Sequence, residues 1–181
     1  MVIFFGPAGS GKSTQGKIIA EKYGGAWLSI GELLRRSAES RPELAEILKA
    51  GELVNSELVM KAIGEAIAAA EGAFVILDGF PRDMWQAEYL RDHGALHYIE
   101  GALVLDGDRE ELMGRLSSRG REDDVRDVIE ERFKLFDSAM EDVLPMMEDE
   151  GVEIVTVNCI GSVEKVTERI EVQLKRWGII K

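Results

Sequence analysis

The segment that most constrains the fold is a glycine-rich loop between a short apolar run and a helical pattern. Val2–Phe5 is entirely apolar, and the chain then reads Gly-Pro-Ala-Gly-Ser-Gly-Lys-Ser from Gly6 to Ser13. After Thr14, apolar periodicity predicts a helix to about Tyr23. Strand, glycine loop, lysine, hydroxyl and helix in this order match the P-loop, whose amides and helix N-terminus hold phosphate groups. A turn that only joins a strand to a helix is the alternative.

Positions within this loop have separate predicted tasks. The glycines let the backbone turn its amides toward the phosphates, and Lys12 reaches the β- and γ-phosphates of a nucleoside triphosphate. The Ser13 hydroxyl is placed to bind Mg²⁺. The predicted donor-phosphate residues are Gly9, Ser10, Gly11, Lys12, Ser13 and Thr14.

The rest of the chain alternates short apolar strands with helical patterns. Further strand candidates are Ala26–Ser29, Ala73–Leu77, Ala102–Leu105 and Glu153–Val157. Strands that are apolar on both faces belong in a parallel sheet covered by helices on both sides, so we expect a doubly wound α/β sandwich of five strands. A chain of 181 residues is the size of one domain, and ligands bind beyond the carboxyl ends of such strands.

Composition excludes several classes. The net charge of −12 argues against a nucleic-acid binder, which needs a basic surface. The single cysteine, Cys159, can form neither an internal disulfide nor a multi-cysteine zinc site, and we interpret it as a small buried hydrophobe. No apolar run approaches the ~20 residues that span a bilayer. We therefore expect a cytoplasmic protein without a membrane partner.

A second motif follows the predicted strand Ala73–Leu77. Asp78 stands at the strand end, where P-loop enzymes hold Mg²⁺ through water, although a helix N-cap is the alternative for it. Gly79 permits close approach of a ligand, and Arg82 can form a fork of two hydrogen bonds to a phosphate. Gln86 follows four residues later, and its carboxamide can pair with an amino group and a ring nitrogen of adenine.

Arginines gather in the last third of the chain. Arg115 and Arg119 are four apart on one helix and share a face, close in sequence to Arg121. Arg132 falls within the apolar stripe of a helix predicted from about Asp123 to Met147, made by Val125, Val128, Ile129, Phe133, Phe136 and Met140. Bound phosphate would satisfy these cations. The alternatives are a buried carboxylate for Arg132 and surface salt bridges for the others. We interpret Arg36, Arg41, Arg109 and Arg126 as solvated charges.

These motifs together resemble adenylate kinase and the related nucleoside monophosphate kinases. The P-loop is similar to theirs, with Ser13 where glycine is commoner. Leu28 to Arg35 resembles the segment whose arginine grips the acceptor phosphate, and Gly51 to Val54 the turn that contacts the acceptor base. The stretch from Asp78 to Gln86, the lid arginines with Asp123 and Asp124, and Asn158 to Val163 beside the donor adenine complete the likeness.

The resemblance implies a set of site residues. Donor contacts beyond the P-loop are Arg115, Arg119, Gly161 and Val163. Acceptor contacts are Ser29, Ile30, Gly31, Arg35, Glu52, Val54, Gly79, Arg82, Gln86, Arg121 and Arg132. Catalytic groups are Lys12, Arg82, Arg119, Arg121 and Arg132, with Mg²⁺ on Ser13 and, through water, on Asp78. It also implies a core of residues 1–28, 59–118 and 125–181, a helical acceptor-binding segment at 29–58, and a very short lid at 119–124 without structural zinc.

The implied reaction is reversible, Mg-dependent transfer of the γ-phosphate of ATP to AMP, giving two ADP. The acceptor phosphate is already anionic, so no general base is needed, and His93 and His97 are interpreted as surface or turn residues. Ile30 matches neither the threonine usual in adenylate members nor the alanine of pyrimidine members, and Asn55 replaces a usual proline. A UMP/CMP kinase is therefore one alternative. A non-catalytic P-loop regulatory protein, whose nucleotide-dependent motions serve a partner, is an alternative from a different class. The family resemblance makes a monomer the default.

Overall fold

The computed structural model describes residues 1–39, 46, 56–70, 72–120 and 124–181, which form an α/β sandwich around a parallel sheet. The five strands found in these residues lie in the order β2-β3-β1-β4-β5, and every neighbouring pair is parallel. Their bounds are β1 Val2–Phe5, β2 Ala26–Ser29, β3 Val75–Asp78, β4 Gly101–Asp106 and β5 Ile154–Asn158. The predicted fold class is confirmed.

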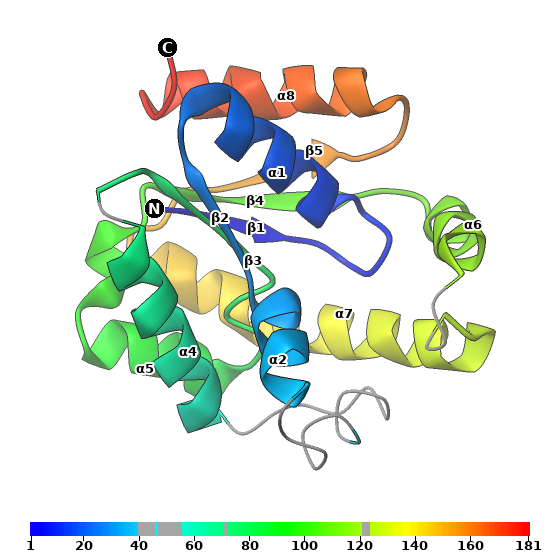
Figure 1. Cartoon of the computed structure of the whole chain (residues 1–181), viewed down its shortest axis with the longest axis horizontal. Helices are drawn as coiled ribbons and strands as arrows, with labels where there is room; N and C mark the ends of the chain where they lie inside the picture. Colours follow the sequence, from blue (N-terminus) through cyan, green and yellow to red (C-terminus); the bar gives the residue numbers. More distant parts are fainter. Residues whose placement is uncertain (40–45, 47–55, 71, 121–123) are drawn as a thin grey trace.

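Helices cover both faces of the sheet, because parallel strands need crossover connections. Along the chain they are α1 Lys12–Tyr23, α2 Ile30–Ala38, α4 Ser56–Ala69, α5 Met84–Asp92, the 3-10 helix η1 Ala95–Tyr98, α6 Arg109–Arg119, α7 Arg126–Asp149 and α8 Val163–Arg176. Figure 1 shows α1 and α8 on one face and α4, α5 and α7 on the other. The loop after β1 and helix α6 lie at the same end of the sheet (right side of Figure 1).

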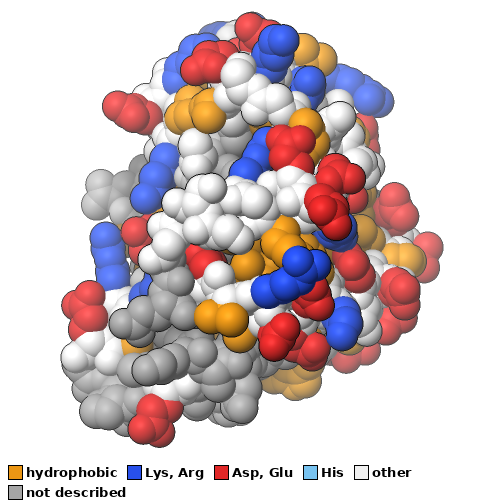
Figure 2. Space-filling view, turned by 90° about the vertical axis from the view of Figure 1, so that its right-hand side faces the viewer, with side chains coloured by type: hydrophobic (Ala, Val, Ile, Leu, Met, Phe, Trp, Pro, Cys, Tyr) orange, Lys and Arg blue, Asp and Glu red, His pale blue; other side chains and the backbone are white. Residues whose placement is uncertain are grey.

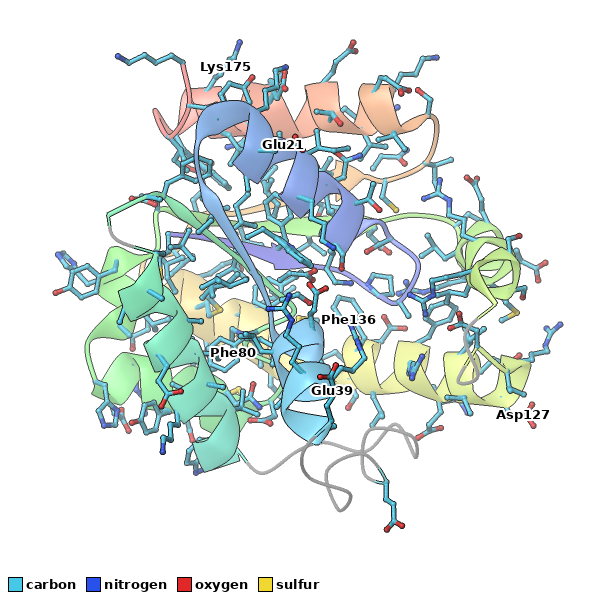
Figure 3. The ribbon with its side chains drawn as sticks, viewed as in Figure 1. Glu21, Glu39, Phe80, Asp127, Phe136 and Lys175 are labelled. Carbon is cyan, nitrogen blue, oxygen red and sulfur yellow. The ribbon has the colours of Figure 1, made fainter. Side chains whose placement is uncertain are left out.

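Alternate side chains of the central strand enter two apolar layers, because successive residues of a strand point to opposite faces. Ile3 and Phe5 pack into the layer that includes residues of α4, α5 and α7. Val2 and Phe4 pack into the layer with α1 and α8. Phe80 is fully buried in the first layer, and Figure 3 shows it beneath the sheet beside α2. Burial on both sides explains why β1 is apolar throughout.

Strand ends differ by one or two residues from the prediction. β3 was expected at Ala73–Leu77 but ends one residue later, at Asp78. Likewise, β4 continues to Asp106 and β5 to Asn158, and these two residues pair in the sheet. A polar residue at the carboxyl end of a parallel strand keeps the strand hydrogen bonds while its side chain reaches the ligand-binding edge. Hydrophobicity alone therefore ended these strands too early.

The predicted helix from about Asp123 to Met147 corresponds to α7, which begins at Arg126. Val125 was assigned to its buried stripe, but it is the extended N-cap residue and is 56% exposed. Ile129, Phe133 and Met140 are buried as predicted. The N-cap of the helix thus lies at the surface, and its buried stripe begins at Ile129.

Charged side chains are spread over the surface that Figure 2 shows. Figure 2 views the end of the molecule where α6 lies, with many Asp and Glu side chains along its right edge and Lys and Arg groups between them. Lys175 and Asp127 project outward from α8 and α7 (Figure 3). In the part of the chain that the structure describes, no helix has the length and apolar character needed to cross a membrane.

Candidate active site

The glycine-rich loop lies at the carboxyl end of β1 and packs closely against neighbouring backbone. Gly6 has φ +145°, and a Cβ there would lie 2.3 Å from the carbonyl oxygen of Leu105 in β4. Only glycine permits this approach, because a side chain would collide with immovable main chain. Ser10 is buried within the loop, and α1 starts at Lys12. The order of strand, loop and helix predicted for the P-loop is therefore present.

The ammonium group of Lys12 folds back over this loop. Its Nζ donates to the carbonyl oxygens of Gly6 at 2.6 Å and Pro7 at 3.0 Å. Burial is the largest cause that lowers the pKa of Lys12 to about 8; the charge of Asp78 opposes this shift and that of Arg82 adds to it. A cation that loses hydration in this way gains strongly from an added anion. Triphosphate is such an anion, and binding it would restore the usual preference for the charged lysine.

Ser13 and Asp78 form the candidate magnesium site. The Ser13 Oγ donates a hydrogen bond of 2.7 Å to Asp78 Oδ2, and the carboxylate is 3% exposed at the end of β3. Hydroxyl and carboxylate oxygens are hard ligands that suit Mg²⁺, which keeps several waters and binds few protein groups. Within the described ranges no cluster of three or more His, Cys, Asp or Glu residues could hold a metal. A site completed by nucleotide phosphates fits the residues present.

The alternative role for Asp78, a helix N-cap, is wrong. Asp83 caps α5 instead: it is extended, and its Oδ1 accepts from the backbone N–H of Gln86 at 2.8 Å. Asp78 lies five residues before that cap, inside the sheet and beside Ser13. Its buried carboxylate is thus available to the phosphate site.

Arg82 reaches toward the same region from the turn after β3. Its Nε donates to the carbonyl oxygen of Gly79 at 2.7 Å. The residue is exposed to solvent, yet surrounding protein atoms reduce the hydration of its guanidinium and so lower its pKa. Asp78 raises this pKa, whereas the like charges of Arg35 and Arg132 lower it further. Three arginines from separate elements therefore act on one another, as expected where an anion binds.

Gln86 is buried at 2% exposure in the first turn of α5. Its Oε1 accepts from the backbone N–H of Arg82 at 2.8 Å. The carboxamide predicted to read adenine therefore also fixes the main chain that carries Arg82. This second contact was not foreseen, because it depends on the turn between β3 and α5.

Arg115, Arg119 and Arg132 interact with oxygen atoms of the protein itself. Arg119 makes two hydrogen bonds to Asp124, of 2.9 and 2.6 Å, and the Asp124 side chain is only 1% exposed. An Nη1 of Arg132 lies 3.9 Å from the same carboxylate. Arg115 donates to the carbonyl oxygen of Cys159 at 3.0 Å and pairs with Glu111. The buried-carboxylate alternative for Arg132 is thus present, and Asp124 contacts both Arg119 and Arg132.

A cavity of about 460 Å³ lies over the glycine-rich loop, and its lining does not include Asp78, Arg82, Gln86 or Arg132. Its floor is the glycine-rich loop and the start of α1, and one wall carries Arg115, Arg119 and the turn before α8. Arg35, from α2, lines the same cavity. Of the predicted donor contacts, the cavity brings together Gly9, Ser10, Gly11, Lys12, Ser13, Thr14, Arg115, Arg119, Gly161 and Val163.

The acceptor segment is described in part. Ser29 is buried and caps α2, Ile30 is 2% exposed in the apolar layer, and the Arg35 guanidinium lies 3.2 Å from the position of a Cβ on Gly31. Three predicted contacts lie outside the described residues: Glu52, Val54 and Arg121. The acceptor-binding segment 29–58 and the lid 119–124 also extend over residues outside the described ranges.

Two arginine assignments and the cysteine can be compared with the structure. Arg109, predicted to be solvated, is held by Asp106 and Asp137 and lies over the ring of Phe133, 5.1 Å from its centre. This prediction was wrong because the partners come from β4 and α7. Arg126 fits the prediction, since it is largely exposed with one helical partner. Cys159 is buried, as predicted, but it also lines the cavity.

The sequence analysis did not identify Gln15 as a functional residue, and it did not predict that Asp124 pairs with arginines. Gln15 is 3% exposed and hydrogen-bonds to α8. A polar residue directly after the P-loop hydroxyls, on the buried side of α1, was the available signal. Asp124 could have been paired with arginines only by knowing that α6 and α7 meet.

The family model described as adenylate kinase matches residues 4–152.

The chain belongs to the adenylate kinase family.

An adenylate kinase of Synechococcus sp. (strain WH7803) is 35% identical over 179 residues, covering 96% of this chain and 97% of the relative. One of Mycolicibacterium smegmatis is 36% identical over 177 residues, covering 93% and 95%. Membership of the adenylate kinase family makes the chain a phosphotransferase that acts on nucleotides, as the sequence predicted.

Proposed function

We propose that the protein transfers the γ-phosphate of ATP to AMP in a reversible, magnesium-dependent reaction that gives two ADP. The observation that carries this proposal is the shared cavity, in which the glycine-rich loop and Arg35 face one space although they come from different elements. A nucleotide-binding module needs one phosphate site. A second cationic site beside the first supports a two-substrate reaction.

Transfer requires the acceptor phosphate oxygen to lie in line with the γ-phosphorus while negative charge is neutralised. Lys12 and the loop amides hold the donor phosphates. Arg35 and Arg82 orient the acceptor phosphate, and Arg119, Arg121 and Arg132 stabilise charge on the transferring group. Magnesium, when bound with ATP, supplies further neutralisation, and Ser13 and Asp78 are the residues that would hold it. Closure of the acceptor segment and lid would exclude water as a competing acceptor.

Adenine as the acceptor base is supported by Gln86, the buried carboxamide beside Arg82. Ile30 departs from both family patterns, but its side chain is packed in the apolar layer and adds no polar group. Because Ile30 does not distinguish the two acceptor classes, a UMP/CMP kinase is the second candidate.

The test is a coupled assay that offers ATP and Mg²⁺ with AMP, UMP, CMP, dCMP or GMP and follows diphosphate formation. AMP should be the preferred acceptor, and preference for UMP or CMP would overturn the acceptor assignment. Formation of no diphosphate from any acceptor would favour the regulatory module. Binding of two adenosines linked by five phosphates separates these cases, because a kinase should bind it far more tightly than ATP.

A further inference from the structure

A buried polar link joins the P-loop helix to the first turn of α8. The Nε2 of Gln15 donates to the carbonyl oxygen of Val163 at 3.0 Å, and the hydroxyl of Thr167 donates to Gln15 Oε1 at 2.7 Å. Gln15 and Thr167 are 3% and 8% exposed. A carbonyl can only accept, so the amide nitrogen of Gln15 must face Val163 and its oxygen must face Thr167. The orientation of the carboxamide is therefore determined by its partners.

This link lies at the junction of the two halves of the cavity. Ser13, one residue from Thr14 and two from Gln15, belongs to the phosphate half. Gly161, in the turn before α8, and Val163, the first residue of α8, form the half next to which the donor base is proposed to lie. Figure 1 shows α1 and α8 side by side on one face of the sheet. The residues assigned to the acceptor come from other elements.

We propose that Gln15 is a positioning residue for the donor nucleotide, which sets the distance between the phosphate loop and the donor-base turn. Gln15 lines the cavity, but its side-chain amide is hydrogen-bonded to Val163 and Thr167 of α8. ATP binds both halves at once, so its affinity depends on their spacing, whereas a ligand made only of phosphates uses one half. The inference rests on the proposed function in taking ATP as the donor.

Gln15→Leu removes both hydrogen bonds of the link and leaves its other groups with hydrogen-bond partners. In this variant the Thr167 hydroxyl can turn to the Val163 carbonyl oxygen, which already lies 2.9 Å away, so no buried donor is left unpaired. We expect Gln15→Leu to raise the Kd of ATP about tenfold, while the Kd of inorganic tripolyphosphate stays within about twofold. In turnover, KM for ATP should rise and KM for AMP should not.

Thr167 provides graded variants. Thr167→Val keeps the Gln15 bond to Val163 but removes the second bond, so its effect on ATP affinity should be smaller than that of Gln15→Leu. Thr167→Ser retains the hydroxyl and should bind ATP like the original protein. An equal loss in Thr167→Ser would contradict a role for the hydroxyl bond.

Lys22 offers a matched control, since its ion pair of 2.6 Å with Glu171 joins the same two helices on the surface. Lys22→Gln should leave both dissociation constants within about twofold, because exposed ion pairs contribute little. The proposal is overturned if Gln15→Leu leaves ATP binding unchanged, weakens ATP and tripolyphosphate equally, or matches Lys22→Gln. If the original protein binds ATP but does not phosphorylate AMP, only the proposed function fails, because ATP binding by calorimetry still tests Gln15.

Discussion

Replacing Arg82 with alanine separates the contribution of this arginine to catalysis from its contribution to stability. Its guanidinium is held by the carbonyl oxygen of Gly79 and lies within reach of the repulsive charges of Arg35 and Arg132. In the absence of nucleotide, lost hydration and these like charges together outweigh the attraction of Asp78, because their net effect lowers the pKa of Arg82. Removal of one of these cations should therefore leave the free energy of unfolding unchanged or slightly increased.

The catalytic effect should be large. Arg82 can direct two charge-assisted hydrogen bonds at the acceptor phosphate, each of about 1.5–3 kcal/mol. Loss of both raises the transition-state barrier by about 3–6 kcal/mol, which is a decrease of about 10²–10⁴-fold in kcat/KM. Stability and activity should thus respond in different ways to one substitution.

The measurement combines a coupled assay of ADP formation with thermal unfolding of the nucleotide-free protein. Arg91→Ala is the matched control, because Arg91 lies on the following helix and forms an exposed ion pair with Asp92. It should change neither kcat/KM nor Tm appreciably. Arg82→Ala with kcat/KM within about tenfold of the original would refute the assignment. A marked fall in Tm would show instead that the arginine is structural.

Three other substitutions or conditions address the same site. Gly79→Ala should reduce kcat/KM, because φ is +75° and the new Cβ would lie 3.0 Å from Arg82 Nη2. The control Gly24→Ala, at φ +70° with open space around it, should lower only Tm. Equal kcat/KM values for the two variants would contradict this prediction. Asp124→Ala should cost about 2–4 kcal/mol in urea unfolding, since its two arginines lose a buried partner, and an unchanged midpoint would oppose that view. ATP affinity, measured by calorimetry without magnesium, should fall about tenfold from pH 7 to pH 9, because Lys12 is charged below its pKa of about 8 and neutral above it. Lys12→Arg should abolish this pH dependence, and a flat profile in the original protein would contradict the lowered pKa.

The phosphate loop was predictable because its physics is local. From Gly6 to Ser13, the glycines, the lysine and the hydroxyl lie within one turn between a strand and a helix, so sequence spacing determines their geometry. Strand number and parallel pairing also followed from short, apolar segments that must be covered on both faces.

The arginine partners could not be predicted in the same way. Ion pairs form between whichever charges the fold brings together, and an acidic chain offers each arginine many carboxylates. Arg109 was interpreted as solvated until the packing of β4 against α7 placed Asp106 and Asp137 beside it. The pairing of Arg119 with Asp124 likewise requires α6 and α7 to meet.

The sequence by itself determined the phosphate loop, the fold class and the kinase family, since these depend on neighbours in the chain and on a repeating apolar pattern. Only the tertiary structure decided that Arg35 enters the cavity of the glycine loop, that Asp124 is buried between arginines, and that Gln15 ties α1 to α8. Each of these depends on side chains far apart in sequence. Their distances are set by how the helices pack on the sheet, which no local pattern encodes.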